Sequence, residues 1–321
     1  MNATEISAGE LDTKTFIEEK AKEIAETVGD GFAINALSGG VDSSVVTLLG
    51  HQALGPRLKT YFIDNGIMRQ NEPESIAAVF KKLGVRIDIV NAQDKFFKAL
   101  KGLTDPEEKR EAVTQTFYKD VFAKLVKESG AKFLLQGTIL TDIDETVAGI
   151  KRQHNVFEQL GIDPQKAFGY KILEPLVQLR KDGVRKVGEA LGLPPSIYQR
   201  MPFPGPALAA RVIGEVTPEK IQVVRQATAI TEEMLVNTQA FQSMAILHND
   251  RVTGMRDGKR DFGLQIEIRC WDSIDARQAR PTELPYALLS QLAQRITGEV
   301  PGVVSVTYNM ATKPPSTMEA V

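Results

Sequence analysis

The sequence has few of the residues that form disulfides or zinc sites. Its 321 residues include a single cysteine, Cys270, and three histidines, His51, His154 and His248. One cysteine cannot form a disulfide within the chain, and we therefore expect a cytoplasmic protein. The histidines lie far apart in sequence and do not have the spacing of metal ligands.

Long apolar runs and an excess of charge of one sign are missing as well. No run of about 20 apolar residues occurs, so no membrane-spanning helix is expected. The start of the chain lacks the basic head and apolar core of a secretory signal. The 39 basic and 41 acidic residues leave a net charge of −2, so we expect neither nucleic acid nor a membrane surface as a partner. The length suggests two domains.

Short strand-like runs alternate with helical segments over the first 200 residues. The runs that favour strands are residues 32–37, 59–66, 85–90, 132–139 and 169–176. The segments that favour helices are residues 14–29, 41–54, 73–84, a region from Pro106 to about 130 that Asp105 caps, and 181–192. This alternation predicts an α/β fold, a parallel sheet with helices on both faces. Ligands of such sheets bind beyond the carboxyl ends of the strands, where the strand order reverses.

Proline is concentrated in one stretch, with five prolines between residues 194 and 206. We expect neither helix nor strand there and place a domain boundary within it, giving domains 1–200 and 201–321. Beyond the boundary, Thr217 and Pro218 begin a helical segment. It is followed by strand-like runs at 241–248 and 262–271, a helix at 284–300 and a strand at 303–310. The pattern predicts a small α+β domain.

The stretch "SGGVDSS", residues 38–44, lies between the first strand and the following helix. It lacks the lysine of the commonest phosphate-binding loop. Its glycines permit close approach of the backbone, and the free N–H groups that open the helix attract an anion. Asp42 would repel a phosphate unless a divalent cation lay between them, so the stretch predicts a magnesium-bound pyrophosphate. The alternative is a Gly/Ser turn with a capped helix, which the flanking strand and the dense run of donors make less favourable.

This motif resembles the signature of the ATP pyrophosphatases, or PP-loop family, which cleave ATP between its α- and β-phosphates. Other segments resemble, in the same order, the ATP pyrophosphatase part of the GMP synthetases, among them "FIDNGIMRQNE", "LLQGTI", "ILEPL", "PFPGPALAARVIGEV" and "KPPSTME". The resemblance runs from about residue 14 to residue 319. It implies an adenine nucleotide alpha hydrolase-like fold, a C-terminal dimerisation domain that helps to bind xanthosine monophosphate (XMP), and a homodimer. The implied reaction is ATP-dependent amination of XMP to GMP through an O2-adenylyl intermediate, with release of AMP and pyrophosphate.

The resemblance also implies roles for residues on the ATP side. The residues expected to bind ATP are Ser38, Gly39, Gly40, Val41, Asp42, Ser43, Ser44, Phe62, Ile63 and Gly137, with Phe62 and Ile63 near the adenine. Asp42 would lie near Mg²⁺, and Lys171 would neutralise charge that develops on ATP. Taken alone, Lys171 is equally a solvated lysine at the end of a strand. Asp142 and Glu145 match acids near the family's cleft, and their alternative role is to start a helix.

On the acceptor side, the resemblance assigns XMP to the proline-rich segment and the C-terminal tail. The residues expected to bind it are Pro204, Gly205, Pro206, Arg211, Lys313, Thr317 and Glu319. Three segments depart from the family pattern, namely residues 151–155, residues 272–283 with Arg277, Arg280 and Pro281, and the last four residues. Two alternatives therefore stay open, a diverged PP-loop enzyme that adenylates another acceptor for amidation or thiolation, and a nucleotide sensor without turnover.

A glutaminase would need a nucleophilic cysteine on a tight turn with a histidine downstream. Cys270 lies instead in a strand pattern, "EIRCWDS", and is expected to pack in a core. We therefore predict that the chain does not hydrolyse glutamine. Ammonia would come from solution or from a separate glutamine amidotransferase subunit, an arrangement that the family also uses.

Overall fold

The computed structural model describes residues 4–147, 170–256, 258–274 and 276–320. The chain forms two compact units. Unit 1 comprises Met1–Asp64, Glu72–Asn91 and Phe117–Arg200, and unit 2 comprises Asn65–Asn71, Ala92–Thr116 and Met201–Val321. Two inner segments that were predicted to belong to the first domain thus pack with unit 2. Residues 151–155, which depart from the family pattern, and the side chain of Glu145 lie outside the described residues.

Unit 1 contains a five-stranded parallel sheet with the strand order β3-β2-β1-β4-β5. Its strands are β1 Ala33–Ala36, β2 Leu58–Asp64, β3 Ile87–Asn91, β4 Phe133–Leu135 and β5 Lys171–Leu173. All five were predicted, and the predicted α/β sheet is confirmed. β1 is uncharged because it lies at the centre, where strands flank it on both sides and helices cover its faces.

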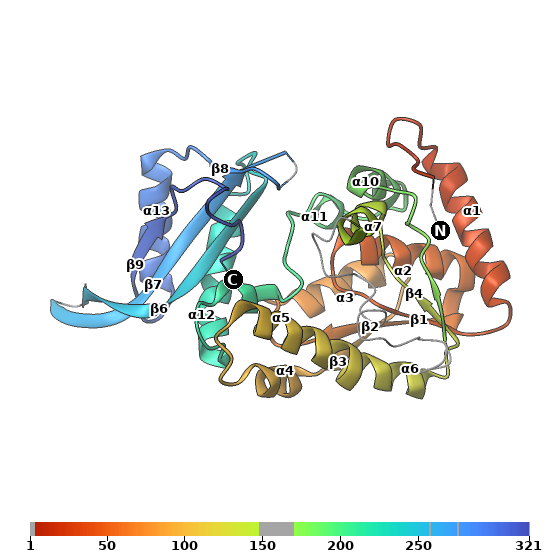
Figure 1. Cartoon of the computed structure of the whole chain (residues 1–321), viewed down its shortest axis with the longest axis horizontal. Helices are drawn as coiled ribbons and strands as arrows, with labels where there is room; N and C mark the ends of the chain where they lie inside the picture. The colour runs from red at the N-terminus through yellow and green to blue at the C-terminus, as the bar shows by residue number, and fades with distance from the viewer. Residues whose placement is uncertain (1–3, 148–169, 257, 275, 321) are drawn as a thin grey trace. The chain divides into compact units, whose positions relative to one another are not determined.

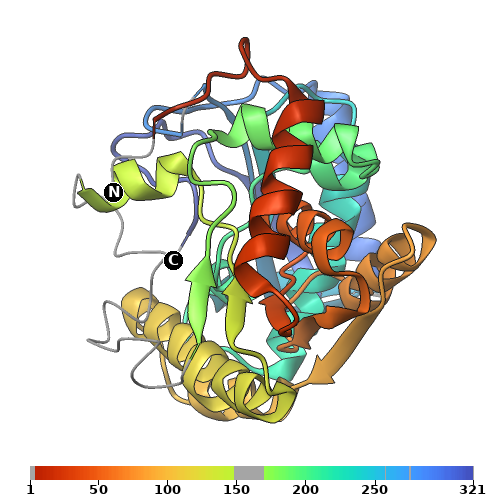
Figure 2. The ribbon, with the colours of Figure 1, turned by 90° about the vertical axis from the view of Figure 1, so that its right-hand side faces the viewer.

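Helices lie on both faces of this sheet (Figures 1 and 2). The helices of unit 1 are α1 Thr13–Val28, α2 Val41–Leu54, α3 Glu72–Lys82, α6 Ala123–Ser129, α7 Leu140–Val147, α10 Lys181–Ala190 and α11 Pro195–Tyr198, with a 3-10 turn at Gly55–Arg57. α1 and α10 both pack against α2, which itself lies on β2 and β4. α6 lies on the opposite face (Figure 1).

The strand order reverses beside β1. The chain proceeds outward from β1 to β2 and β3, then crosses back to β4 on the other side of β1. Ala33 pairs with both Leu58 of β2 and Phe133 of β4. The carboxyl ends of β1 and β4 are therefore the place where a doubly wound sheet opens a crevice for a ligand.

A buried polar network ties three elements together directly beneath this crevice. Asn35 of β1 donates from Nδ2 to Thr47 Oγ1 of α2 at 2.7 Å and accepts from Thr60 Oγ1 of β2 at 2.7 Å. Thr47 Oγ1 donates in turn to the Ser43 carbonyl oxygen at 2.7 Å. All three network side chains are almost fully buried. Because each group has its partner, the hydrogen bonds offset the cost of burying these polar groups, and the network fixes the start of α2 on the sheet.

Unit 2 is built on an antiparallel hairpin. Its strands are β6 Gln242–Arg256, β7 Lys259–Asp272, β8 Arg280–Pro281 and β9 Val303–Tyr308, and its helices are α4 Gln93–Leu100, α5 Pro106–Gln115, α12 Pro218–Met234 and α13 Tyr286–Glu299. β9 pairs in parallel with β7. α12 packs on β6 and α13 on β9, and the two helices contact each other, so they cover one face of the sheet. Thr217 caps α12 and Asp105 caps α5, as predicted.

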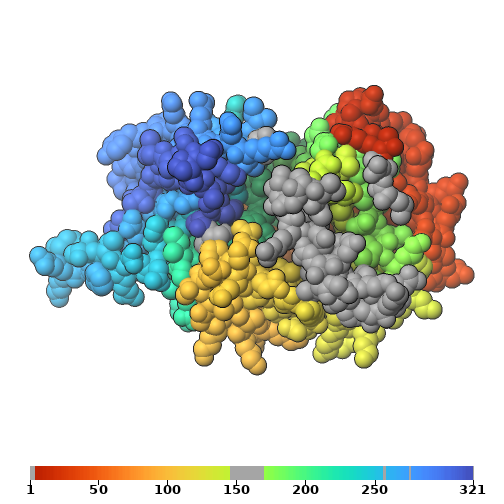
Figure 3. Space-filling view, in the orientation of Figure 1, coloured from red at the N-terminus to blue at the C-terminus, as the bar shows by residue number. Residues whose placement is uncertain are grey.

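Several boundaries differ from the prediction. The helical region predicted after Asp105 is confirmed from α5 to α6, but its middle part, Thr116–Phe122, is a π-helix that was not predicted. A short helix, α11, occurs in the proline-rich stretch where none was predicted. Pro195 is tolerated there because it lies in the first turn, where the backbone N–H group that proline lacks would not be hydrogen-bonded within the helix. The hairpin strands run on through polar residues 249–261, which carry no apolar pattern, and their tip stands clear of the rest of unit 2 (Figure 3). The helix α4 and the strand β8 were not predicted.

In the described part of the chain, no helix is both long and apolar enough to cross a membrane.

Replacing Asn35 with alanine is expected to destabilise unit 1. The change leaves the buried Thr60 hydroxyl group without its acceptor, which typically costs about 1–3 kcal/mol, while Thr47 keeps its bond to the Ser43 carbonyl oxygen. Urea unfolding should show a lower midpoint for Asn35→Ala. Lys22→Ala is the control, because its ion pair with Glu26 is 3.8 Å long and exposed and should matter little. Equal midpoints for the two variants would show that the network does not stabilise the fold.

Candidate functional site

A cavity of about 250 Å³ opens at the carboxyl ends of β1 and β4. The loop contributes Ser38, Gly40, Asp42 and Ser43 to its lining, and the segment after β4 contributes Gln136, Gly137 and Thr138. Asn35, Asp142 and the aromatic residues Phe117, Tyr118 and Phe122 complete much of the remaining wall. The cavity thus lies at the reversal of strand order, where the sequence predicted a ligand.

The loop is a tight turn held by its own hydroxyl groups. Ser43 Oγ accepts from the Ser38 amide at 3.2 Å, lies 2.9 Å from Ser38 Oγ, and donates to the Gly40 carbonyl oxygen at 3.1 Å. α2 begins at Val41, so the amides of its first turn have no carbonyl acceptor one turn earlier in the helix. These N–H groups and the helix dipole favour an anion at the cavity wall.

An ion pair supports the outer side of the loop. Glu72 is buried and bonds to Arg200 at 2.5 Å, and Arg200 Nη1 donates to the Gly39 carbonyl oxygen at 3.1 Å. Gly39 has φ +80°, and a Cβ there would lie 3.2 Å from Glu72 Oε1 and 3.3 Å from Arg200 Nη1. Glycine at this position therefore permits the positive φ and leaves room for the ion pair, where a side chain would crowd it.

Gly137 brings a second backbone against the start of α2. A Cβ on Gly137 would lie 3.1 Å from the carbonyl carbon of Asp42 and 3.2 Å from the nitrogen of Ser43. These neighbours are backbone atoms at the beginning of a helix and cannot turn aside. Only glycine allows the segment after β4 to approach the loop this closely.

Asp42 faces the cavity with one oxygen atom paired and the other not. Its Oδ2 accepts from Lys181 Nζ at 2.6 Å. Its Oδ1 is buried and has no hydrogen-bond partner among the described residues. A buried carboxylate oxygen without a donor is costly, and a bound cation would satisfy it. Lys181, the first residue of α10, was not predicted as a site residue, although it starts the charged segment "KDGVRK".

The other predicted ATP-side residues are scattered. Phe62 and Ile63 are buried in β2, Ser44 is fully buried in α2, and none of the three is among the described residues that line the cavity. Lys171 begins β5 opposite Phe133, the first residue of β4, so its backbone lies at the amino end of the sheet, away from the loop. Asp142 lines the cavity, and its Oδ2 accepts from the Ile139 amide at 3.0 Å.

The aromatic wall comes from the π-helix between α5 and α6. Phe117 packs edge-on against Tyr118 with ring centroids 4.9 Å apart and stacks on Phe122 at 6.0 Å. Burial raises the pKa of Tyr118 to about 12, so its hydroxyl group stays protonated at neutral pH. This wall was not predicted, because the helical region from Pro106 to about residue 130 was predicted without a π-helix in it. A wall of this kind suits a flat aromatic ring.

In unit 2, the predicted acceptor residues include an unusual arginine. Arg211 is fully buried, and its Nη1 and Nη2 have no hydrogen-bond partner among the described residues. Its Nε lies 3.4 Å from Glu319 Oε2, and its guanidinium group lies over the Phe203 ring, 4.7 Å from the centroid. Two unpaired donors on a buried cation favour binding of an anion, such as a phosphate group.

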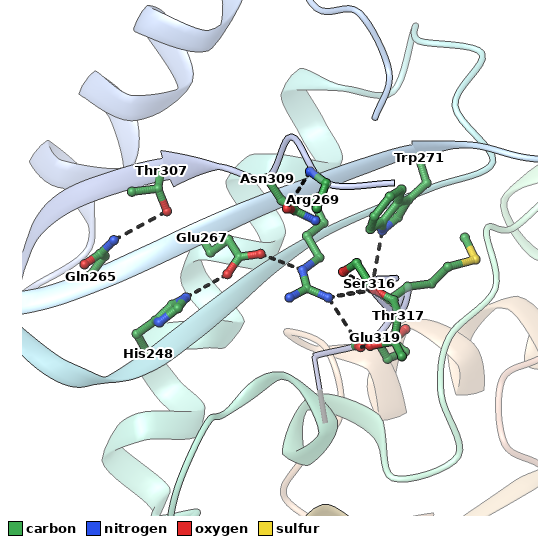
Figure 4. Close-up of polar contacts among 12 residues, drawn as sticks. His248, Gln265, Glu267, Arg269, Trp271, Thr307, Asn309, Ser316, Thr317 and Glu319 are labelled. Carbon is green, nitrogen blue, oxygen red and sulfur yellow. Dashed lines mark hydrogen bonds and ion pairs between the residues drawn. The ribbon is translucent and has the colours of Figure 1, made fainter. Parts of the chain in front are cut away.

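The remaining acceptor residues lie in the same unit. Pro204, Gly205 and Pro206 lead directly into the 3-10 turn Ala207–Arg211. In the C-terminal tail, Lys313 Nζ donates to the Ala276 carbonyl oxygen at 2.7 Å. Thr317 Oγ1 donates to the Glu319 carbonyl oxygen at 2.6 Å, and the tail lies on the sheet beside Arg269 and Trp271 (Figure 4).

Comparison with known proteins matches both parts of the chain. A family model described as GMP synthase C terminal domain matches residues 229–320, and one described as Asparagine synthase matches residues 35–257. A protein from Pyrococcus horikoshii, named as one of the subunits of a glutamine-hydrolyzing GMP synthase, is 46% identical over 312 residues, which cover 96% of this chain and 99% of that protein. The chain belongs to this GMP synthase family.

Two further relatives have the same name. The Pyrococcus furiosus protein is 47% identical over 307 residues, which cover 95% of this chain and 96% of that protein, and the Archaeoglobus fulgidus protein is 46% identical over 309 residues, which cover 96% and 99%. The resemblance drawn from the motifs is thereby confirmed over almost the full chain. The family consists of ATP-using PP-loop ligases, and the loop at residues 38–44 lies within the segment that the second family model matches.

Gly137→Ala should weaken ATP binding, because the added methyl group must displace the backbone of Asp42 and Ser43. Overpacking of this kind typically costs about 1–3 kcal/mol, so we expect the dissociation constant for ATP to rise about tenfold to a hundredfold. Gly298→Ala is the control, because a Cβ there meets nothing within 4 Å. Calorimetric titration with ATP measures both variants, and unchanged affinity in Gly137→Ala would rule out the close approach as a requirement.

Proposed function

We propose that this chain is the ATP pyrophosphatase subunit of a GMP synthase. An oxygen atom of XMP attacks the α-phosphorus of ATP, and the bond from that phosphorus to the bridging oxygen breaks to release pyrophosphate. Ammonia then displaces AMP from the adenylyl intermediate and leaves GMP. The observation that carries the proposal is the loop at residues 38–44, which lines a cavity at the reversal of strand order with an unpaired carboxylate oxygen on Asp42.

The leaving pyrophosphate is assigned to the loop. The amides of Val41, Asp42 and Ser43 are the first three of α2, and the hydroxyl groups of Ser38 and Ser43 stand beside them. These donors are held in place before the reaction by the Asn35 network and by Arg200. Donors fixed in advance stabilise negative charge that develops on the leaving group without further reorganisation.

Magnesium fits the site through Asp42. No cluster of three or more His, Cys, Asp or Glu side chains in the described ranges could hold a metal ion by itself. Magnesium is typically bound by one or two carboxylates together with substrate phosphates and water, and Asp42 Oδ1 supplies such a carboxylate oxygen. The ion would neutralise charge on the ATP phosphates when bound. It would enter with ATP rather than occupy a site made by the protein alone.

The cation beside the phosphates is assigned to Lys181 rather than Lys171. Lys181 Nζ already lies 2.6 Å from Asp42, whereas Lys171 begins β5 at the amino end of the sheet, away from the loop. The ammonium group is half-exposed and can move from the carboxylate to a phosphate oxygen when ATP binds. The adenine ring is assigned to the aromatic wall formed by Phe117, Tyr118 and Phe122.

The XMP phosphate is assigned to Arg211, with Pro204, Gly205 and Pro206 beside it in sequence. A phosphate dianion would satisfy the two unpaired guanidinium nitrogens, which suits a charge-assisted bidentate bond. Lys313, Thr317 and Glu319 are assigned to the phosphate and ribose. Lys313 Nζ would leave the Ala276 carbonyl oxygen to do so.

The ammonia that aminates XMP is assigned to a source outside this chain. Cys270 is buried in β7, and burial raises the pKa of its thiol, which is the opposite of an activated nucleophile. The relatives are named as one subunit of a glutamine-hydrolyzing enzyme, which implies at least one other. We infer a glutamine amidotransferase subunit as partner and a homodimer of this chain as its assembly.

The decisive assay follows pyrophosphate release from ATP and magnesium in the presence of ammonium, with and without XMP. The proposal expects release that depends on XMP, and no glutamate from glutamine. Release without XMP that responds to another acceptor would support a diverged PP-loop enzyme, for which Arg277 and Arg280, both exposed, would be the first candidates. No release under any condition would support a nucleotide sensor.

Asp42→Asn should abolish most magnesium-dependent turnover while the chain stays folded. The change removes the charge but keeps the shape, and loss of one charge-stabilising group typically costs about a hundredfold or more in rate. Asp88→Asn is the control, since Asp88 forms an exposed ion pair with Arg86 and does not line the cavity. Full activity of a folded Asp42→Asn variant would contradict the assignment.

Lys313→Ala should raise the KM for XMP and leave the KM for ATP unchanged. A charge-assisted hydrogen bond contributes about 1.5–3 kcal/mol, so the XMP KM should rise about tenfold to a hundredfold. The ATP KM should not change, because Lys313 is assigned no contact with ATP. Lys259→Ala, at the exposed hairpin tip, removes the same charge as a control. Equal effects of the two variants on the XMP KM would remove Lys313 from the acceptor site.

A further inference from the structure

The C-terminal tail of the chain is docked on the sheet by one arginine. Arg269 of β7 donates from Nη1 to the carbonyl oxygen of Thr317 at 2.8 Å and lies 3.4 Å from those of Met318 and Glu319 (Figure 4). A guanidinium nitrogen shared by three consecutive carbonyl groups holds the backbone of the tail and not merely one side chain. Chain termini are usually loose unless such contacts hold them.

Glu267 holds Arg269 itself, and His248 in turn holds Glu267. Its Nε donates to Glu267 Oε1 at 2.6 Å, and Glu267 Oε2 lies 2.7 Å from His248 Nε2 (Figure 4). Burial alone would raise the pKa of Glu267, but the hydrogen bonds from His248 and Arg269 lower it below its ordinary value. The carboxylate is therefore charged at neutral pH, and it fixes the guanidinium plane from the side opposite the tail.

An apolar contact adds to this docking. Met318 is buried, and it packs with Met244, Ile246 and Trp271 in one cluster. Trp271 Nε1 donates to the Met318 carbonyl oxygen at 3.3 Å. The preceding part of the tail is held separately, because the backbones of Lys313 and Ala279 pair with each other. Arg269 therefore controls the last residues of the tail and not its beginning.

The docked tail presents Glu319 to the acceptor residues. Glu319 Oε1 accepts from Gln242 Nε2 at 2.7 Å, and Oε2 lies 3.4 Å from Arg211 Nε. This contact occupies the Nε side of Arg211 and leaves Nη1 and Nη2 without partners among the described residues. The orientation of the buried arginine thus depends on where the tail places one carboxylate.

We propose that Arg269 is the positioning residue of the acceptor site, and that Glu267 and His248 orient it. By holding the carbonyl groups of residues 317–319, Arg269 sets the position of Glu319, which directs the free nitrogens of Arg211 toward the nucleotide. This proposal rests on the assignment of XMP to the tail and Arg211. It adds three residues that would not themselves touch the substrate.

Arginine suits this role and lysine does not. The guanidinium group has donors on Nε and on two terminal nitrogens in a rigid plane, so it bonds to Glu267 and to the tail at once. A lysine ammonium group is a single point of charge on a flexible stem, and it would reach either partner but not both. Arg269→Lys therefore keeps the charge and removes the bridge.

The test compares Arg269→Lys and Glu267→Gln with the wild-type chain. Hydrogen–deuterium exchange of the peptide that contains residues 314–320 reports the docking without any reference to activity. Steady-state pyrophosphate release reports the KM for XMP, the KM for ATP and kcat. Arg295→Lys is the control, because Arg295 is an arginine of unit 2 whose ion pairs in the described part of the chain are with Glu233 of α12 and Glu299 of α13.

The proposal expects faster exchange in the tail and a rise of the XMP KM of about tenfold for Arg269→Lys, the loss of about one charge-assisted hydrogen bond. Glu267→Gln should show a smaller rise, and the ATP KM should not change in either variant. Unchanged exchange in Arg269→Lys would overturn the docking role. Faster exchange with an unchanged XMP KM would overturn the link between the tail and the acceptor. Absence of XMP-dependent release in the wild-type chain would instead contradict the proposed function.

Discussion

The site depends on the contact between two backbones at the centre of the parallel sheet. The segment after β4 touches the start of α2 at Gly137, where even one methyl group would meet the backbone of Asp42 and Ser43. This contact occurs where the strand order reverses beside β1. The Asn35 network beneath it and the Arg200 contact above it keep the loop in place. The cavity and its donors follow from this arrangement.

The electrostatics of the site follow from the same loop. The opening of α2 attracts an anion, while Asp42 places a negative charge in its first turn. Lys181 partly compensates that charge, and Asp42 Oδ1 stays without a donor among the described residues. A phosphate group alone would meet repulsion from Asp42, whereas a phosphate accompanied by a divalent cation would satisfy both groups. The geometry thus favours a nucleotide that arrives with its metal ion.

Much of the fold and part of the candidate site could be predicted from the sequence, because the sequence patterns that specify them are local. The five strands of unit 1, the loop between β1 and α2, and the caps at Asp105 and Thr217 depend on residues a few positions apart. Lys181 could not be predicted, since its contact with Asp42 joins residues 139 positions apart. The aromatic wall was missed because a π-helix has no distinct sequence pattern. The docking of the tail by Arg269 likewise depends on sheet packing that a single sequence does not reveal.

The most direct test of the proposed reaction uses XMP labelled with oxygen-18 at the O2 position, together with ATP, magnesium and ammonium. If the O2 atom of XMP attacks the α-phosphorus of ATP, the oxygen-18 label must leave with AMP. Mass spectrometry should then find oxygen-18 in the phosphate group of AMP and none in pyrophosphate. Unlabelled AMP formed together with GMP, or label in pyrophosphate, would contradict the claim that this loop holds ATP for adenylation of XMP.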